Sequence, residues 1–204
     1  MIFIRKILNL LILFVLFFSF PYVSIAAEEE AVFAGGCFWC LEHDLESLPG
    51  VKNVESGYSG GISLDPTYEN HKGHQESVRV IFDNKQISYS DLLRSYWRNI
   101  DPLDQEGQFC DRGDSYKPVI FTQSKSQEET SNLSIEKVSK EIDKPIEKIK
   151  VIIKPFEKFW IAESYHQNFA EINSLTYKFY RYRCGRDQRL EKVWGKNARS
   201  QNDW

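Results

Sequence analysis

A glycine pair set between a short apolar run and a cysteine constrains this chain more than any other feature. Residues 31–34 are apolar, a buried strand is expected over residues 31–35, and Gly35-Gly36-Cys37-Phe38-Trp39-Cys40 follows the apolar run directly. Glycine allows a tight backbone turn, so we predict a strand, a sharp turn and a helix over residues 37–48, ended by Pro49-Gly50. Cys37 would then lie at the helix N-terminus, where free backbone N–H groups and the helix dipole favour a thiolate. We therefore expect Cys37 to be a reactive nucleophile.

The rest of the chain predicts alternating strands and helices. Strands are expected over residues 51–59, 76–82, 118–122 and 149–154. Helices are expected from an N-cap at Ser90 to about Arg98, over 124–142 and, as the last helix, over 163–173. The first six elements follow the split βαβ order of a ferredoxin-like sheet. The predicted fold class is therefore α+β, a ferredoxin-like split βαβ sheet covered by helices. Two long loops, residues 57–75 and 101–117, are expected to carry function.

The first 26 residues have the features of an export signal. Arg5 and Lys6 precede an apolar run over residues 7–20, Pro21 breaks the run, and Ser24-Ile25-Ala26 places small residues where a signal peptidase cleaves. The run is shorter than the roughly 20 residues of a membrane-spanning helix. We expect a cleaved export signal over residues 1–26, a single catalytic domain over residues 27–204, and a periplasmic or other extracytoplasmic location. An uncleaved leader that anchors the protein to a membrane is the alternative.

The charge and length of the chain narrow the class of protein. The formal net charge is −3, and no stripe of lysine and arginine is interleaved with aromatic residues, which argues against nucleic acid as a partner. The length suits one domain with its own core. Nothing in the sequence indicates an obligate interface, so we expect a monomer.

The four cysteines leave several kinds of protein open. In an exported chain they could form two structural disulfides, as in a disulfide-stapled extracellular binding domain with no free thiol. Cys37 and Cys40 are too close in sequence to close a useful loop, so a redox pair is favoured. A Cys-x-x-Cys after a strand also suggests a thioredoxin-like thiol–disulfide oxidoreductase. His43 follows at helical spacing, but no matching second cysteine pair is present, and we predict no metal site.

The two long loops supply the other chemically capable side chains. Tyr68 and Glu76 lie in or just after the first loop, and Tyr116 closes the second. A cysteine can attack an electrophilic sulfur, an acid whose pKa is raised by burial can donate a proton, and two phenols can hold an oxygen. Such a set suits the reduction of an oxygen-bearing group. His166, near the end of the chain, is expected to cap or to pack.

Six sequence blocks occur in an order that resembles a known family. They are Ala34-Gly35-Gly36-Cys37-Phe38-Trp39 with Glu42, Gly57-Tyr58-Ser59-Gly60-Gly61, Asp65-Pro66-Thr67-Tyr68, Gly73-His74-Gln75-Glu76, Asp101-Pro102 with Asp111-Arg112-Gly113 and Tyr116, and Phe159-Trp160 through Tyr165-His166-Gln167. Together they resemble the signature of the A-type peptide methionine sulfoxide reductases, from about residue 31 to residue 194.

The resemblance implies a reaction and a site. The reaction is thiol-dependent reduction of methionine-(S)-sulfoxide, free or in proteins, to methionine, which repairs oxidised proteins. The implied site comprises Cys37 as nucleophile, Glu76 as proton donor to the sulfoxide oxygen, Tyr68 and Tyr116 as hydrogen-bond donors to that oxygen, Asp111 as an orienting group, and Phe38 and Trp39 as the walls of the methyl pocket.

The resemblance also implies a second cysteine and a reductant. Cys37 would be left as a sulfenic acid, which a resolving cysteine converts into an intramolecular disulfide. Cys40, one helical turn away, is the first candidate and Cys184 is the second. Cys110 is expected to be a packed thiol, because Asp111 beside it would raise its pKa. No bound cofactor is implied, and a thioredoxin-like protein or a small dithiol would reduce the disulfide.

Overall fold

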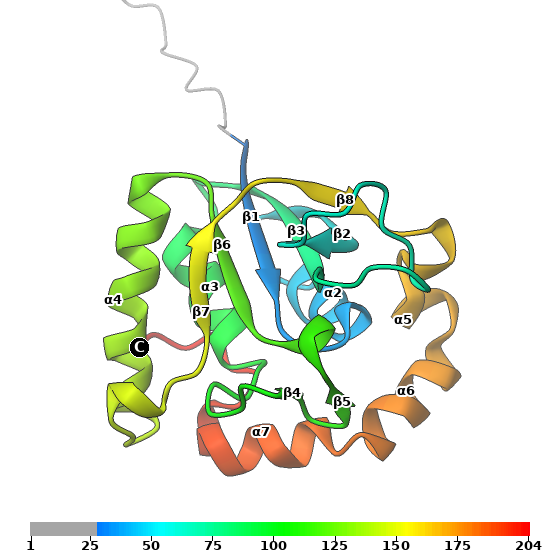
Figure 1. The fold of residues 1–204 in the computed structure, drawn as a ribbon. Coiled ribbons are helices and arrows are strands. Elements are labelled where there is room, and N and C mark those ends of the chain that lie inside the picture. Colours follow the sequence, from blue (N-terminus) through cyan, green and yellow to red (C-terminus); the bar gives the residue numbers. More distant parts are fainter. Residues whose placement is uncertain (1–27) are drawn as a thin grey trace, which may run out of the picture.

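A six-stranded sheet in the order β7-β6-β1-β3-β2-β8 forms the centre of the computed structural model, which describes residues 28–204 (Figure 1). The strands are β1 (Glu28–Ala34), β2 (Val51–Ser59), β3 (Gln75–Asp83), β6 (Val119–Thr122), β7 (Ile152–Pro155) and β8 (Phe159–Ile161). Neighbouring strands are antiparallel, except that β6 and β7 are parallel. The predicted export signal lies outside the described residues. Within them, no helix is long and apolar enough to span a bilayer.

β1 is covered on both of its faces, which explains its unbroken apolar run. Ala31 and Phe33 belong to the main core, whereas Val32 and Ala34 pack with Val119 and Phe121 of β6 on the other face. Since successive strand residues point to opposite faces, a strand covered on one side only would alternate apolar and polar residues. The strand that leads to Cys37 is therefore a fixed element inside the molecule.

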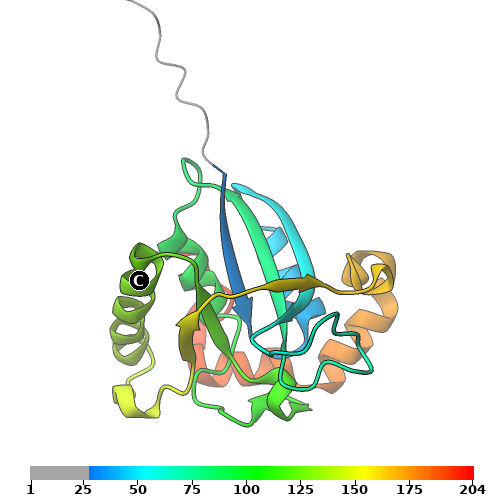
Figure 2. The ribbon, with the colours of Figure 1, turned by 45° about the horizontal axis from the view of Figure 1, so that its top comes forward.

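Helices surround the sheet. α2 (Phe38–Glu46) and α3 (Tyr89–Trp97) lie behind it in the view of Figure 1, and α4 (Lys125–Glu141) packs beside β6 and β7. The chain ends with α5 (Phe169–Ile172), α6 (Ser174–Arg183) and α7 (Arg186–Trp194), and α6 and α7 run along one end of the sheet (Figure 2). A small hairpin of β4 (Gly107–Gln108) and β5 (Asp111–Arg112) lies near them, followed by a 3₁₀ turn over Asp114–Tyr116.

The predicted mixture of helices and strands is confirmed, but the end of the chain was predicted wrongly. Residues 163–173 do not form the last helix. They contain a 3₁₀ turn at Ser164–His166 and the short α5, and two further helices follow. α6 buries only Tyr177 and α7 buries three side chains, so their sequences carry little of the apolar periodicity that marks a helix. Strand β8 was also not predicted.

The start of α3 lies two residues earlier than the sequence analysis expected. Ser88, and not Ser90, is the N-cap: its Oγ accepts a hydrogen bond from the backbone N–H of Asp91 at 3.1 Å, and the Asp91 carboxylate accepts one from the backbone N–H of Ser88 at 3.2 Å. This reciprocal pair is a capping box, which satisfies two backbone donors at once. Ser90 lies inside the first turn.

We predict that Ser88→Ala destabilises the protein by about 1 kcal/mol, because the alanine leaves the backbone N–H of Asp91 without its acceptor. Urea unfolding under reducing conditions measures the change. Ser90→Ala is the matched control and should leave the midpoint almost unchanged. Equal losses for the two variants would contradict the assignment of Ser88 as the cap.

Candidate active site

The turn before Cys37 requires both of its glycines. Gly36 has a φ of +84°, in the left-handed region, and a Cβ there would lie 2.7 Å from the Cβ of Gln108. A Cβ on Gly35 would lie 2.7 Å from the side chain of Ile100. Gly36 is therefore required by the left-handed turn itself, whereas Gly35 leaves room for the side chain of Ile100. Cys37 follows as the N-cap of α2, as predicted from the sequence.

Cys37 lies at a small cleft of about 60 Å³. The cleft is lined by Cys37, Phe38, Trp39, Tyr68, Glu76, Asp111, Tyr116 and Tyr180. The structure thus brings together the predicted nucleophile, acid, phenols, orienting aspartate and aromatic walls, although they come from β3, α2 and two loops. Of the predicted resolving cysteines, Cys40 is buried beside Cys37, and Cys184 lies beyond the cleft next to Asp111.

Glu76 is a buried carboxyl held by the first turn of α2. Its Oε2 accepts a hydrogen bond from the backbone N–H of Phe38 at 3.1 Å, and the side chain is 2% exposed. Burial raises its pKa to about 8, against the lowering effect of the Phe38 N–H, and the negative charge of Asp111 raises it further. Glu76 is therefore protonated at neutral pH and can act as a proton donor.

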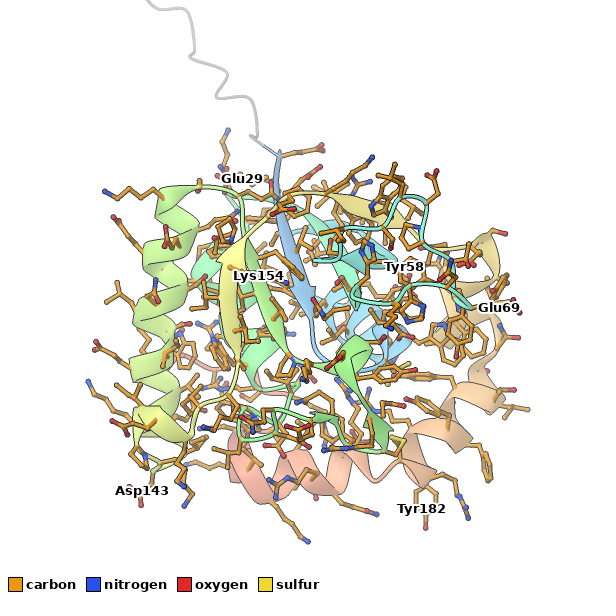
Figure 3. All side chains as sticks on the ribbon, in the orientation of Figure 1. Glu29, Tyr58, Glu69, Asp143, Lys154 and Tyr182 are labelled. Atoms are coloured by element: carbon orange, nitrogen blue, oxygen red, sulfur yellow. A yellow bond between two sulfur atoms is a disulfide. The ribbon has the colours of Figure 1, made fainter. Side chains whose placement is uncertain are left out.

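The loop that carries Tyr68 is fixed by Glu163. The Glu163 carboxylate accepts hydrogen bonds from the backbone N–H of Tyr68 and from the hydroxyl of Tyr58, both at 3.0 Å. Tyr58 is fully buried and points inward in Figure 3, whereas Tyr68 is 42% exposed at the cleft. Burial, together with Glu76, raises the pKa of Tyr68 and of Tyr116, so both phenols keep their protons and can donate hydrogen bonds.

Trp39 forms a rigid aromatic wall. Its Nε1 donates a hydrogen bond to Nδ1 of His166 at 3.1 Å, and its ring stacks on Phe169 with centroids 3.7 Å apart and an angle of 6° between planes. The His166 ring also packs on Phe38, with centroids 4.9 Å apart. His166 is 1% exposed, so the packing role expected for it is confirmed.

Tyr180 is the cleft residue that the sequence analysis missed. Its hydroxyl donates a hydrogen bond to Oδ2 of Asp111 at 2.6 Å. Burial raises the pKa of Asp111, which the Tyr180 hydrogen bond and Arg186 partly offset. Tyr180 comes from α6, a helix that was not predicted. Its spacing of three from Tyr177 and four from Cys184 would have marked one helical face.

Cys110 and Cys184 form a disulfide, so the expectation of a packed Cys110 thiol is wrong. Cys184 is the C-cap of α6, and the β4–β5 hairpin brings Cys110 beside it with the Cα atoms 4.9 Å apart. The two residues are 74 positions apart, and only the fold brings them together. Cys37 and Cys40 remain free thiols, which contradicts a binding domain whose cysteines are all paired.

The state of the two free thiols differs from the expectation for Cys37. Burial raises the pKa of Cys37 well above its ordinary value, with further contributions from Cys40 and Glu76, although the Tyr180 hydroxyl opposes the shift. The hydrogen bond from Cys37 lowers the pKa of Cys40 despite burial, and Arg186 and Arg181 lower it too. Of the two sulfurs, Cys40 therefore carries the negative charge more readily.

Glu42 is a second buried carboxyl in α2. It is 1% exposed, and neither of its oxygens has a hydrogen-bond partner. Burial raises its pKa to about 7, although backbone groups of Asn168 and Phe169 partly oppose the shift. Glu42 packs beneath the segment that supports Trp39 and does not line the cleft.

One group in the described part of the chain has the composition of a metal site. Cys110, Asp111 and Cys184 place potential ligand atoms within 4.8 Å of one another. The two sulfur atoms are bonded to each other in the disulfide, so neither is a thiolate that could bind a metal ion.

Comparison with known proteins agrees with this chemistry. Residues 29–198 match the model of the peptide methionine sulfoxide reductase family. The peptide methionine sulfoxide reductase MsrA 2 of Caulobacter vibrioides is 45% identical over 179 residues, which are 86% of this chain and 90% of that protein. MsrA 2 of Staphylococcus aureus strain MRSA252 is 41% identical over 174 residues, 82% of this chain and 97% of that protein.

Solved structures share the fold. Reduced Mxr1 of Saccharomyces cerevisiae superposes with a TM-score of 0.66 and 24% identity, over 74% of this chain and 88% of that one. Methionine sulfoxide reductase A of Corynebacterium diphtheriae gives a TM-score of 0.65 and 24% identity, over 74% and 78% of the two chains. With the family model spanning nearly all described residues and relatives above 40% identity, this chain belongs to the peptide methionine sulfoxide reductase family.

Proposed function

We propose that this protein reduces methionine-(S)-sulfoxide, free or in oxidised proteins, to methionine with Cys37 as the nucleophile. Membership of the family makes it an oxidoreductase that acts on methionine sulfoxide through thiols. The observation that carries the assignment of residues is the cleft itself, where the Cys37 sulfur and the protonated Glu76 lie on one small surface walled by Trp39. A thioredoxin-like exchange of disulfides is not favoured, because it leaves Glu76 and the phenols without a role.

The geometry supports a simple sequence of bond changes. The sulfoxide oxygen accepts the proton of Glu76 while Tyr68 and Tyr116 hydrogen-bond to it, which makes the sulfur electrophilic. The Cys37 sulfur attacks the sulfoxide sulfur. The proton of Cys37 passes to Glu76, so that this carboxyl is protonated again. The oxygen is then transferred to Cys37 and methionine leaves, so the substrate gains two electrons and the thiol becomes a sulfenic acid. Asp111, held by Tyr180, orients the groups around this centre.

The shape of the cleft supports selection of one sulfoxide diastereomer. The sulfoxide sulfur is a stereocentre that carries an oxygen, a methyl group, the rest of the substrate and a lone pair. The cleft fixes three directions: donors at Glu76 for the oxygen, the Phe38–Trp39 wall for the methyl group, and Cys37 for attack. Sulfur and methyl groups pack favourably on aromatic faces. With three directions fixed, only one hand of the substrate can be attacked.

The two cysteine pairs differ in exposure, which supports different roles for them when the oxidised enzyme is reduced. Cys37 and Cys40 are 6% and 1% exposed, and a protein reductant cannot reach them directly. We propose that Cys40 resolves the sulfenic acid and that disulfide exchange passes the oxidation to Cys110 and Cys184. Cys110 is exposed, and Cys184 Sγ lies 3.8 Å from the Asp111 carboxylate, which also lines the cleft. A thioredoxin-like protein or a small dithiol would reduce this outer pair, and no bound cofactor is required.

Three broader features belong to the same proposal. The antiparallel order β6-β1-β3-β2, with α2 and α3 as connections, supports a ferredoxin-like split βαβ core. The composition of residues 1–26 supports export with cleavage of the leader, and hence repair of oxidised proteins in a periplasmic or other extracytoplasmic compartment. We propose that the domain works as a monomer.

The proposed reaction predicts turnover of one diastereomer only. Purified protein, supplied with a small dithiol, should consume the S-sulfoxide of methionine and leave the R form, and Cys37→Ser should abolish turnover. Chromatographic separation of the two forms measures both. Consumption of the R form, or activity in Cys37→Ser, would contradict the assignment of the nucleophile and its pocket.

We predict that Glu76→Gln folds normally and lowers kcat/KM at least about 100-fold, because a glutamine cannot donate the proton that activates the sulfoxide. Steady-state kinetics measure the loss, and circular dichroism checks the fold. Glu69→Gln is the matched control, since Glu69 is an exposed carboxylate of the neighbouring loop. A near-normal rate for Glu76→Gln would exclude Glu76 as the acid.

The pH dependence of turnover should carry the signature of Glu76. Its pKa is raised to about 8, so the proton is present below that pH and lost above it. kcat/KM should therefore fall with an inflection near pH 8, and this alkaline limb should be missing from the residual activity of Glu76→Gln. An unchanged limb in that variant would assign the titration to another group.

A further inference from the structure

Arg186 is a buried cation that the reaction described so far does not use. It is the first residue of α7 and is 1% exposed. Its Nη2 donates a hydrogen bond to the backbone oxygen of Asn99 at 2.6 Å, but Nε and Nη1 have no hydrogen-bond partner. A buried guanidinium with two unsatisfied donors costs free energy. An anion close to these two donors would therefore be stabilised.

Two residues, each four positions from Cys40 in the chain, show where Arg186 lies: they are Gly36 and Asp44. Its Nε lies 3.8 Å from Oδ2 of Asp44, and its Nη1 lies 3.7 Å from the point where a Cβ on Gly36 would be. Gly36, Cys40 and Asp44 follow at intervals of four residues, so Cys40 and Asp44 share one face of α2 and Gly36 lies at the start of that face. The guanidinium therefore lies along the side of α2 that carries Cys40.

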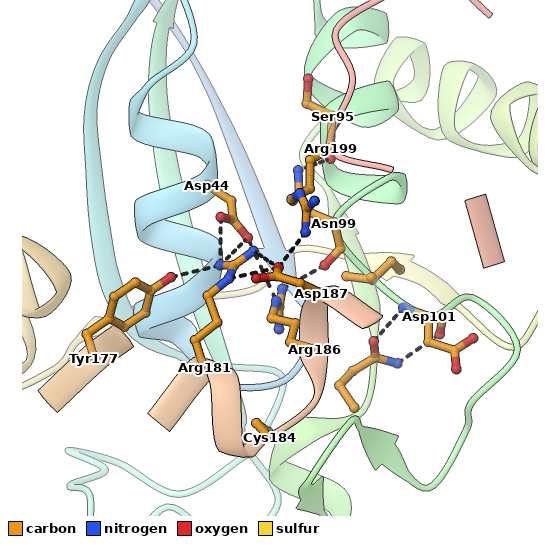
Figure 4. A network of polar contacts seen from close by, with 12 residues as sticks. Asp44, Ser95, Asn99, Asp101, Tyr177, Arg181, Cys184, Arg186, Asp187 and Arg199 are labelled. Carbon is orange, nitrogen blue, oxygen red and sulfur yellow. Dashed lines mark hydrogen bonds and ion pairs between the residues drawn. The ribbon is translucent and has the colours of Figure 1, made fainter. Parts of the chain in front are cut away.

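Asp44 does not neutralise Arg186 fully. Both oxygens of Asp44 accept hydrogen bonds from Nη1 of Arg181, at 2.8 and 3.0 Å (Figure 4). The Nε of Arg186 lies farther from Asp44, at 3.8 Å from Oδ2. On its other side the guanidinium packs over the ring of Phe109, 4.5 Å from its centre. Nε and Nη1 of Arg186 therefore form no hydrogen bond with Asp44, and the positive charge of Arg186 lowers the pKa of Cys40.

The other titratable groups around Cys40 come from three elements. They are Cys37 and Asp44 of α2, Glu76 of β3, and Tyr177, Tyr180 and Arg181 of α6. Of these only Arg181 is a cation, and it is already paired with Asp44 and Asp187. Arg186, by contrast, makes no hydrogen bond to a carboxylate: its Nε lies 3.8 Å from Asp44, and its charge also lowers the pKa of Asp111 of β5.

We propose that Arg186 is a positioning residue for the resolving step, which holds the Cys40 sulfur as a thiolate poised beside Cys37. The inference rests on the proposed function, because Cys37 must first become a sulfenic acid. The Cys40 thiolate then attacks the Cys37 sulfur, a sulfur–sulfur bond forms, and the sulfur–oxygen bond breaks. The oxygen leaves as water after it takes one proton, which the nearby Glu76 can supply. Cys40 is oxidised and the sulfenic sulfur is reduced, so no external oxidant or reductant is needed.

A single turnover without reductant separates the two steps. The background is the full chain with Cys110→Ser and Cys184→Ser, which confines bridge formation to Cys37 and Cys40. Methionine release reports the first step, and intact mass after rapid alkylation counts the remaining free thiols. Both are followed across pH for the background and for Arg186→Met, Arg186→Lys and, as matched control, Arg189→Met. Arg189 lies on the same helix and pairs with Asp101 at 2.6 Å, away from the thiols.

Arg186→Met should leave methionine release within about twofold and slow bridge formation about tenfold at pH 7, since a rise of one pKa unit lowers the thiolate fraction tenfold. The pH profile of bridge formation should move upward by about one unit, Arg186→Lys should restore part of the rate, and Arg189→Met should match the background. An unchanged rate and profile in Arg186→Met would overturn the proposal. Absence of methionine release from the background itself would instead refute the proposed function.

A second variant tests the same idea in the opposite direction and does not depend on the folding of Arg186→Met. Asp44→Asn removes a negative charge that raises the pKa of Cys40. The pH profile of bridge formation should therefore move downward, whereas a purely structural role for this network predicts a slower reaction with an unmoved profile. A profile that stays in place or moves upward would overturn the proposal.

Discussion

The site depends on one hydrogen bond, between the backbone N–H of Phe38 and the carboxyl of Glu76. It joins the first turn of α2 to strand β3, and so fixes the distance between the sulfur at the helix start and the acid on the sheet. The bond also occupies one oxygen of the carboxyl. The other oxygen is left for the proton that burial retains at neutral pH. The proposed nucleophile and the proposed proton donor are thus set in place by backbone geometry.

The tight turn at Gly35 and Gly36 makes that arrangement possible. β1 is packed on both faces, and the turn places Cys37 directly after the end of this strand. The aromatic wall is built outward from the same helix, because Trp39 is clamped between His166 and Phe169. Segments far apart in sequence therefore meet around a short stretch of backbone that follows directly from a buried strand.

The sequence was sufficient for the parts of the site that lie in continuous motifs. The strand–turn–helix around Cys37 and the cleft residues Tyr68, Glu76 and Tyr116 could be found because each follows a local pattern. Tyr180 and the Cys110–Cys184 disulfide could not, since both depend on α6, whose exposed surface hides its helical period. The ionisation of the two thiols could not be predicted from the sequence either. The position of Cys37 at a helix N-terminus could be predicted from the sequence, but the burial that raises its pKa is a property of the fold.

The two buried carboxyls have a consequence for the stability of the whole protein. In the unfolded chain both ionise near pH 4.5, whereas in the fold Glu42 and Glu76 keep their protons to about pH 7 and about pH 8. The folded state then binds more protons than the unfolded state over this range, so the free energy of unfolding must fall as the pH rises through it. A pH high enough to deprotonate Glu76 therefore also removes the contribution of this carboxyl to the stability of the fold. Below this range the contribution of both carboxyls to stability is present in full, and Glu76, the proposed proton donor, keeps its proton.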